Sequence, residues 1–203
     1  MSYPAPAVEA SQRIDLGAGA WLALAPGFLT PAAAQALLST ARQELRWEQR
    51  EVVIFGRRVS QPRLIAWAGS LPYRYSGLVL EPRPAPPPIN HAAAAVSEAA
   101  GVSFNHLLAN RYRDGTDSMG LHADAEPELG PDPAVATLSL GASRRFVLKA
   151  RRGGERRVLE LGDGSLLLMG GTCQRHWVHG VPRTATAGER ISLTFRMLLR
   201  PPA

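Results

Sequence analysis

Residues 190–196 alternate strictly between polar and apolar side chains. The polar positions, which share one face of an extended strand, are Arg190, Ser192, Thr194 and Arg196. The opposite face is apolar. A buried charge is costly unless it meets a partner, so a strand with two inward-facing arginines predicts a cavity that receives a charged ligand.

Most of the chain after residue 101 predicts short strands separated by turns. The expected strands cover residues 106–112, 134–140, 145–149, 156–161, 165–169, 177–181 and 190–198. Such spacing is typical of a sandwich or barrel rather than of βαβ units. The fold class expected is therefore mainly β.

The first half of the chain predicts two helices. Thr30 followed by Pro31 is a strong helix start, and apolar residues recur at helical spacing from about 31 to 46. Residues 89–100 are rich in alanine and are closed by Gly101. Between residues 82 and 88 stand five prolines, which we expect to exclude regular helix.

Further strand-like pieces lie before and between these helices. Residues 21–24 predict a short strand, and 52–59 predict a hairpin with a glycine near its turn. Two more strands are expected at 64–67 and 76–80, with an aromatic pair between them.

Composition and length limit the classes of protein. A chain of 203 residues fits one domain, and no apolar run reaches the ~18 residues of a membrane helix. The start lacks a secretory signal, so we expect a cytoplasmic location. We also expect a monomer without a membrane partner. Cys173 is the only cysteine, which excludes an internal disulfide and a thiolate zinc cluster. The net charge of +6 permits a nucleic-acid partner without requiring one.

Two histidines and a carboxylate indicate a metal site. His122 and Asp124 are two residues apart and share a face on an extended backbone, and His179 follows downstream. Taken singly, each histidine is more often an ordinary core or surface residue. Together on a β scaffold, the three suit an iron(II) site that leaves coordination positions open.

The spacing of the two arginines limits the length of the expected ligand. Arg190 and Arg196 are six residues apart, so their backbones lie roughly 20 Å apart along the strand. They cannot easily hold one carboxylate together. With both side chains reaching inward, each arginine would hold one end of a short dicarboxylate. One of these two ends would also meet the metal. Asn110 and Tyr112 share a face on an earlier strand.

These residues resemble those of the AlkB family of iron(II)- and 2-oxoglutarate-dependent dioxygenases, in particular its duplex-DNA-repair members. The resemblance runs from about Phe28 to Arg200 and is most specific in residues 110–115, 122–124 and 190–196. It implies a double-stranded β-helix (jelly-roll) core with flanking helices. The division it implies is an N-terminal extension at 1–27, helices and nucleotide-recognition lid hairpins at 28–101, and the catalytic core at 102–203.

The resemblance implies a role for each inward-facing residue. His122, Asp124 and His179 match the iron ligands. Arg190 matches the residue that binds the distal carboxylate of 2-oxoglutarate, helped by Tyr112 and Ser192. The remaining matches, near the metal-bound end or lining the same pocket, are Arg196, Asn110 and Thr194.

On the substrate side, the resemblance implies a finger and a lid. Ile54, Phe55 and Gly56 match an apolar finger that fills the gap left by an extruded base, and Arg57 follows it. A lid whose aromatic ring stacks on that base is matched by Tyr73, Arg74 and Tyr75, with the ring of His122 on the other side. Glu126 matches an acid that reads the base edge, whereas Ala125 departs from a second acid common in relatives. Phosphates are expected at Arg57, Arg58, Arg63, Arg151 and Arg152.

The implied activity removes N-linked methyl groups from bases in DNA. Iron(II), 2-oxoglutarate and O2 would be used, with release of succinate, CO2 and formaldehyde, and the base must leave the duplex to react. Two alternatives stay open. One is an oxygenase of the same class that acts on RNA or protein, and the other is a catalytically inactive nucleic-acid-binding module of the same fold.

Overall fold

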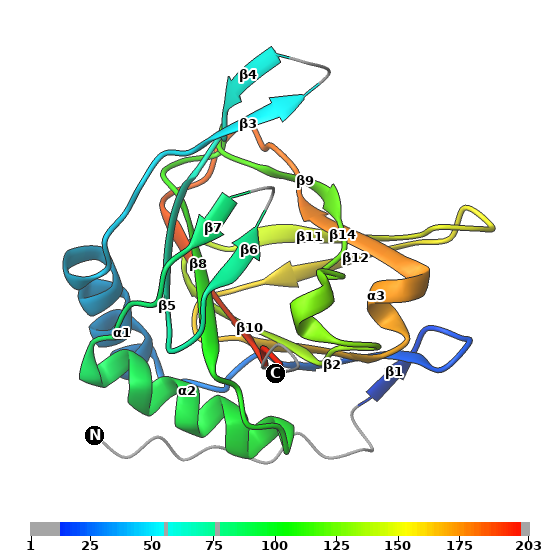
Figure 1. The fold of residues 1–203 in the computed structure, drawn as a ribbon, viewed down its shortest axis with the longest axis horizontal. Coiled ribbons are helices and arrows are strands. Elements are labelled where there is room, and N and C mark those ends of the chain that lie inside the picture. The colour runs from blue at the N-terminus through cyan, green and yellow to red at the C-terminus, as the bar shows by residue number, and fades with distance from the viewer. Residues whose placement is uncertain (1–12, 55–56, 76–77, 200–203) are drawn as a thin grey trace.

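The computed structural model describes residues 13–54, 57–75 and 78–199. Two antiparallel sheets face each other and form the jelly-roll core that the family resemblance implies (Figure 1). In spatial order, the large sheet consists of β1 (Arg13–Asp15), β2 (Ala20–Ala25), β13 (Leu166–Gly171), β10 (Val135–Gly141), β15 (Arg190–Arg196), β8 (His106–Tyr112) and β5 (Leu64–Gly69). The small sheet consists of β12 (Arg156–Leu161), β11 (Arg144–Ala150), β14 (Trp177–Val181) and β9 (Met119–His122).

Two helices, α1 (Pro31–Glu44) and α2 (Pro87–Ala100), pack on the large sheet. Thr30 caps α1, because its Oγ1 accepts a hydrogen bond from the backbone N–H of Ala33. The expectation that prolines exclude helix through residue 88 is wrong. Pro87 and Pro88 begin α2, where the first-turn N–H groups have no helical partner and proline therefore costs little.

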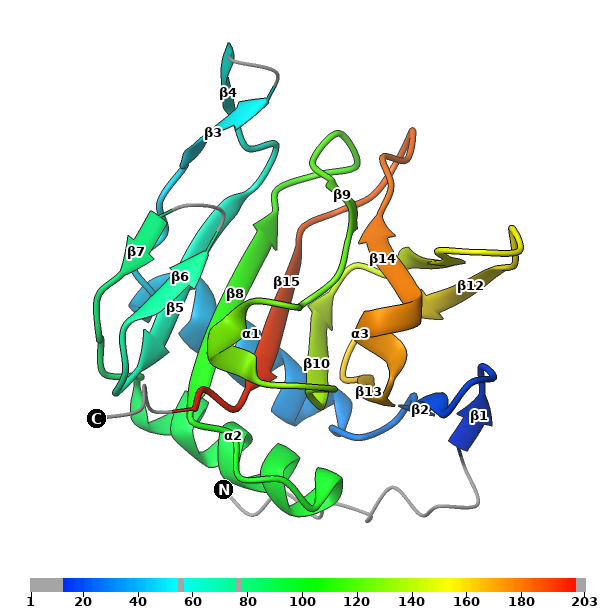
Figure 2. The same cartoon turned by 45° about the vertical axis from the view of Figure 1, so that its right-hand side comes forward.

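The alternation of residues 190–196 places β15 as predicted. This strand lies in the large sheet between β10 and β8 and is buried along its whole length. Its apolar side chains, Ile191, Leu193 and Phe195, belong to the core cluster that includes both helices. Its polar side chains therefore line a cavity together with residues of the small sheet. Figure 2 shows the two sheets between which this cavity lies.

The N-terminal strands differ from the expected division of the chain. β2 pairs with β13 through six residue pairs, and β1 pairs with β2 at the edge. Residues 13–25 are therefore part of the large sheet rather than an extension outside the core. The short β1 and the single-turn helix α3 (Cys173–His176) carry too little periodicity to be predicted from sequence.

Two small hairpins stand apart from the main sheets. β3 (Glu51–Ile54) pairs with β4 (Arg57–Ser60), and this hairpin projects beyond the core (Figure 1). β6 (Tyr73–Tyr75) pairs with β7 (Leu78–Leu80), so the aromatic pair expected between strands lies within one. A 3-10 turn, η2 (Pro127–Leu129), follows β9. Among the described residues, no helix is long and apolar enough to cross a membrane.

Gly180 allows β14 and β9 to approach closely. A Cβ atom at this position would lie 2.7 Å from the carbonyl oxygen of Met119 and 2.9 Å from that of Gly120. Both contacts are with backbone, so relief requires the strands to separate. The pairing that is strained by such a shift joins His179 to His122.

We predict that Gly180→Ala lowers the free energy of unfolding of the metal-free protein by about 1–3 kcal/mol. Gly120→Ala is the matched control, since a Cβ atom there meets nothing within 4 Å. It should change stability by less than about 0.5 kcal/mol. Urea denaturation measures both, and equal effects of the two variants would contradict the close-approach explanation.

Candidate metal centre and co-substrate site

Three possible metal ligands meet between the sheets. His122 ends β9, Asp124 follows two residues later, and His179 lies opposite His122 on β14. One ligand atom from each side chain lies within 4.8 Å of the others. Asp124 is 2% exposed and His179 is 5% exposed. The structure thus brings together the three residues that the sequence singled out.

The Asp124 carboxylate is held at one oxygen and left open at the other. Arg196 donates to Oδ1 from Nε at 3.1 Å and from Nη2 at 2.5 Å. Burial by itself raises the pKa of Asp124, but the charge of Arg196, acting together with His179 and His122, outweighs burial and holds this pKa well below the usual range. Oδ2 is buried, lies 3.5 Å from Nε2 of His179 and has no hydrogen-bond partner in the described part of the chain.

The histidine rings are arranged for metal binding. Nδ1 of His122 lies 3.0 Å from the carbonyl oxygen of Gly120, so an Nδ1–H group donates there and leaves Nε2 free. Burial and the neighbouring His179 lower the pKa of His122 to about 4, which keeps the ring neutral near pH 7. The neutral ring of His122, the ring of His179 and one carboxylate with an unused buried oxygen fit a divalent iron site.

Arg190 is the second charged feature of the cavity. It is 1% exposed, and its Nη2 donates to Oγ of Ser139 at 2.8 Å. Within the described ranges, its Nε and Nη1 have no hydrogen-bond partner. The guanidinium carbon lies 5.4 Å from the ring centre of Tyr112. A buried cation with unused donors is the environment that a carboxylate would complete.

One cavity lining contains the ligands and the expected co-substrate residues. It includes Asn110, Tyr112, His122, Asp124, His179, Arg190, Ser192, Thr194 and Arg196. Arg196 lies at the metal end through its ion pair with Asp124. Arg190 is paired across the sheet with Tyr112, at the far end of β15. Which arginine meets which carboxylate of 2-oxoglutarate stays a prediction.

Arg63 is buried beside the cavity, a position that the sequence analysis did not foresee. Arg63 was expected to meet phosphates, but its side chain is 5% exposed. Its Nε donates to Oδ1 of Asn110 at 2.7 Å, which directs it toward the cavity. A paired guanidinium can be buried where its partner lies inside, and a side chain buried in this way is poorly placed to meet a phosphate.

Tyr73 also departs from the expected lid. Its side chain is fully buried in a cluster with Ile65 and Trp67, and its ring centre lies 4.6 Å from that of His106. As it lies in this structure, Tyr73 cannot stack on an extruded base from a surface position. Hydrophobic contacts with β5 hold it instead.

The other expected substrate residues lie nearer the surface. Glu126 is half-buried, and burial together with the charge of Asp124 raises its pKa. Arg57 and Arg74 are exposed, and Nε of Arg74 lies 4.0 Å from Glu128. Phe55 and Gly56 lie outside the described residues, as do the side chains of Ile54 and Tyr75.

Two neighbours of the site were missed by sequence reasoning. Ser139, which binds Arg190, stands opposite Ser192 in the pairing of β10 with β15. A period of two across residues 135–141, which places Thr137 and Ser139 on one face, would have revealed it. Gln174 accepts a hydrogen bond from the backbone of Asp124, and only the three-dimensional contact reveals this.

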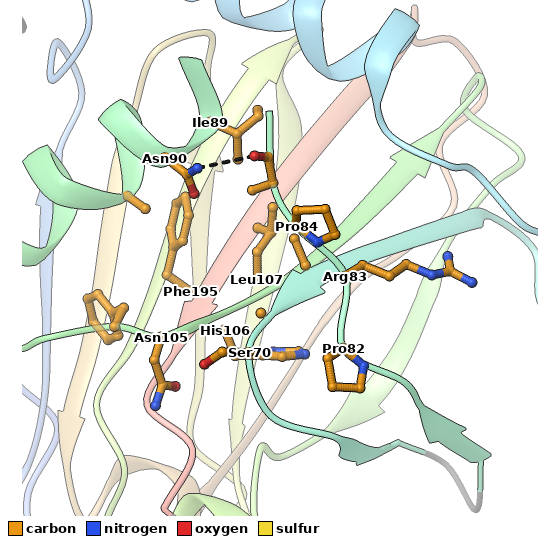
Figure 3. Close-up of a pocket in the computed structure, with 15 residues that line it drawn as sticks. Ser70, Pro82, Arg83, Pro84, Ile89, Asn90, Asn105, His106, Leu107 and Phe195 are labelled. Carbon is orange, nitrogen blue, oxygen red and sulfur yellow. Dashed lines mark hydrogen bonds between the residues drawn. The ribbon is translucent and has the colours of Figure 1, made fainter. Parts of the chain in front are cut away.

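A separate cavity of about 550 Å³ lies between α2, the segment 82–85 and the ends of β5 and β8 (Figure 3). Ile89, Leu107 and Phe195 give it an apolar wall. The side-chain amides of Asn90 and Asn105 already donate to backbone carbonyl oxygens. None of the three metal-ligand candidates lines this cavity, so it is distinct from the site described above.

Comparisons with known proteins agree with this geometry. Residues 22–196 match the family model of the 2OG-Fe(II) oxygenase superfamily. The chain is 38% identical over 190 residues to the rat alpha-ketoglutarate-dependent dioxygenase alkB homolog 3, which covers 88% of this chain and 64% of the relative. It is 40% identical over 159 residues to the human DNA oxidative demethylase ALKBH2, covering 73% and 61%. It therefore spans less than two thirds of either relative's length.

A solved structure shows a similar fold. The structure of OsALKBH1 superposes with a TM-score of 0.64 at 18% sequence identity. The alignment covers 91% of this chain and 99% of that one. At this identity the likeness concerns the arrangement of sheets and helices.

His106 gives a pH-dependent prediction. This residue is 3% exposed, and burial together with Arg196 lowers its pKa to about 3. An unfolded chain binds this proton below pH 6.5 whereas the folded protein does not, so stability is lost as pH falls from about 6.5 toward 3. Between pH 6.5 and 5, the wild type should lose about 1.5 kcal/mol more unfolding free energy than His106→Phe. Parallel pH profiles in urea denaturation would contradict this.

Proposed function

Because this chain belongs to the 2OG-Fe(II) oxygenase superfamily, we propose that it removes alkyl groups oxidatively from N-methylated bases in DNA. The observation that carries the proposal is a cluster of two histidines and one carboxylate with an unused buried oxygen, in a cavity that two buried arginines also line. The names of the relatives, a dioxygenase and a DNA oxidative demethylase, support the reaction and the substrate. A cytoplasmic location and a monomeric state stay predictions from the sequence.

The proposed reaction balances with one co-substrate. O2, 2-oxoglutarate and an N-methyl group give succinate, CO2, formaldehyde and the unmethylated base, with one oxygen atom in succinate and the other in formaldehyde. Iron(II), when bound, supplies the oxygen-activating chemistry. His122, Asp124 and His179 would hold it, and the donor set leaves other coordination positions for co-substrate and oxygen.

The protein's own contribution is charge and position. Arg190 would hold the distal carboxylate of 2-oxoglutarate through its unused donors, next to Tyr112. Asn110, oriented by Arg63, lies on the same face of β8. Since these groups are buried, water competes poorly with the dianion for them. The metal-bound end would lie toward Arg196 and Asp124.

The DNA side depends on elements around the cavity mouth. The hairpin β3–β4 projects from the core, and Arg57 and Arg58 on β4 are exposed, where they would meet phosphates. Phe55, which lies between the residues of β3 and β4 in the sequence, would serve as the apolar wedge that replaces the extruded base. Glu126 offers a buried Oε2 that has no hydrogen-bond partner among the described residues, and we propose that it contacts the base edge.

A panel of methylated oligonucleotides tests this proposal. The full chain is incubated with iron(II), ascorbate and 2-oxoglutarate, and substrate masses are read for single- and double-stranded DNA and for RNA. Loss of one methyl group from DNA, absent in Asp124→Ala, is the expected result. Preference for RNA, or no loss from any oligonucleotide, would contradict the DNA assignment. Phe55→Ala should reduce activity on duplexes more than on single strands.

Variants of Arg190 and Arg58 should distinguish 2-oxoglutarate binding from DNA binding. We predict that Arg190→Ala weakens 2-oxoglutarate binding about 100-fold, since a buried charged contact is lost, while DNA affinity changes little. Arg58→Ala, a variant of an exposed arginine, should reduce DNA affinity and its salt dependence without affecting 2-oxoglutarate. Calorimetric titration with each ligand measures both. Equal loss of both ligands in Arg190→Ala would contradict its assignment to the cavity.

A further inference from the structure

Gln174 makes a buried contact with the main chain of a proposed iron ligand. This residue lies on α3, the single helical turn that leads directly into β14 (Figure 2). It is 2% exposed, and its Oε1 accepts a hydrogen bond from the backbone N–H of Asp124 at 3.0 Å. The two residues are 50 positions apart in the sequence, so the contact is a product of the fold.

Asp124 needs such a partner because of where it stands. β9 ends at His122, and residues 123–126 belong to no strand or helix. The backbone N–H of Asp124 is therefore outside the ladder that pairs β9 with β14. A buried N–H without an acceptor destabilises the folded state. Gln174 removes this destabilisation and fixes the direction in which the chain carries the carboxylate.

The other half of the Gln174 amide is poorly satisfied. Its Nε2 lies 3.8 Å from Sδ of Met169, and a thioether is a weak acceptor. An apolar side chain of similar size would pack here without burying an NH2 group. The buried NH2 group of Gln174 is thus unfavourable at this position. The advantage of glutamine over an apolar residue here is its acceptor oxygen Oε1.

We propose that Gln174 is a positioning residue for the metal ligand Asp124. Arg196 holds Oδ1 from the large sheet, and Gln174 holds the main chain from α3. These two contacts together direct Oδ2 toward His179. Because α3 runs into the strand of His179, the carboxylate and the second histidine are tied to one segment. This inference rests on the proposed iron site and names a residue that sets its geometry.

Metal affinity of the metal-free protein tests the role. Mn(II), a redox-stable substitute for iron(II), is titrated calorimetrically into the full chain and into Gln174→Met. The variant keeps the side-chain volume and loses the acceptor. We expect its dissociation constant for Mn(II) to rise about 10-fold or more, as is typical when a residue that orients a ligand is removed. Its thermal midpoint without metal should fall by about 2–12 °C, because the backbone N–H of Asp124 then lacks its acceptor, while the variant stays folded.

Two matched variants separate hydrogen bonding from packing. Met169→Leu changes the same part of the core and leaves the Gln174 acceptor in place. Gln61→Met makes the same chemical change at another buried glutamine, which is 3% exposed. Both should bind Mn(II) as the wild type does. Equal weakening in Met169→Leu and Gln174→Met would assign the effect to packing and overturn the inference.

The remaining outcomes are also decisive. If Gln174→Met binds Mn(II) as tightly as the wild type, the inference is wrong while the proposed function stands. If the wild type itself does not bind Mn(II), the proposed iron site is wrong, and the proposed function is rejected together with the inference. Should Gln174→Met not fold, amide exchange in the metal-free wild type decides. The N–H of Asp124 must exchange far more slowly than that of exposed Ala125, and equal rates would overturn the inference.

Discussion

The ion pair between Arg196 and Asp124 is the contact on which the site depends. Arg196 belongs to β15 of the large sheet, whereas Asp124 follows β9 of the small sheet, so one buried pair spans the cavity between the two layers. Removing one member would leave an uncompensated buried charge, at a cost of about 3–5 kcal/mol. By occupying only one carboxylate oxygen, Arg196 leaves the other directed toward the histidines.

The interior of this protein is polar beyond what stability requires. Oδ2 of Asp124 and two nitrogens of Arg190 are buried without hydrogen-bond partners in the described part of the chain. Such groups destabilise a folded protein unless a ligand or a neighbouring group binds to them. A bound divalent metal would coordinate the free carboxylate oxygen, and a bound dianion would accept hydrogen bonds from the guanidinium. The same atoms that weaken the ligand-free fold therefore define what it binds.

Local periodicity predicted much of this arrangement, and long-range packing supplied the rest. The alternation from Arg190 to Arg196 indicated which side chains enter the cavity, because the period of a strand is a local property. The burial of Tyr73 and Arg63 could not be foreseen in this way. Each depends on β5 and β8 meeting side by side, which is a contact between distant segments. Gln174 lies on a turn too short for any pattern, so only the assembled fold reveals its contact with Asp124.

Ordered binding of metal and co-substrate tests the account most directly. Under anaerobic conditions, the metal-free chain is titrated with iron(II) and then with 2-oxoglutarate, and each step is followed by calorimetry. The cluster predicts one iron(II) per chain, and 2-oxoglutarate that binds much more tightly once iron is present, with both effects lost in Asp124→Ala. Tight 2-oxoglutarate binding that ignores the metal, or iron binding that survives Asp124→Ala unchanged, would contradict the proposed centre.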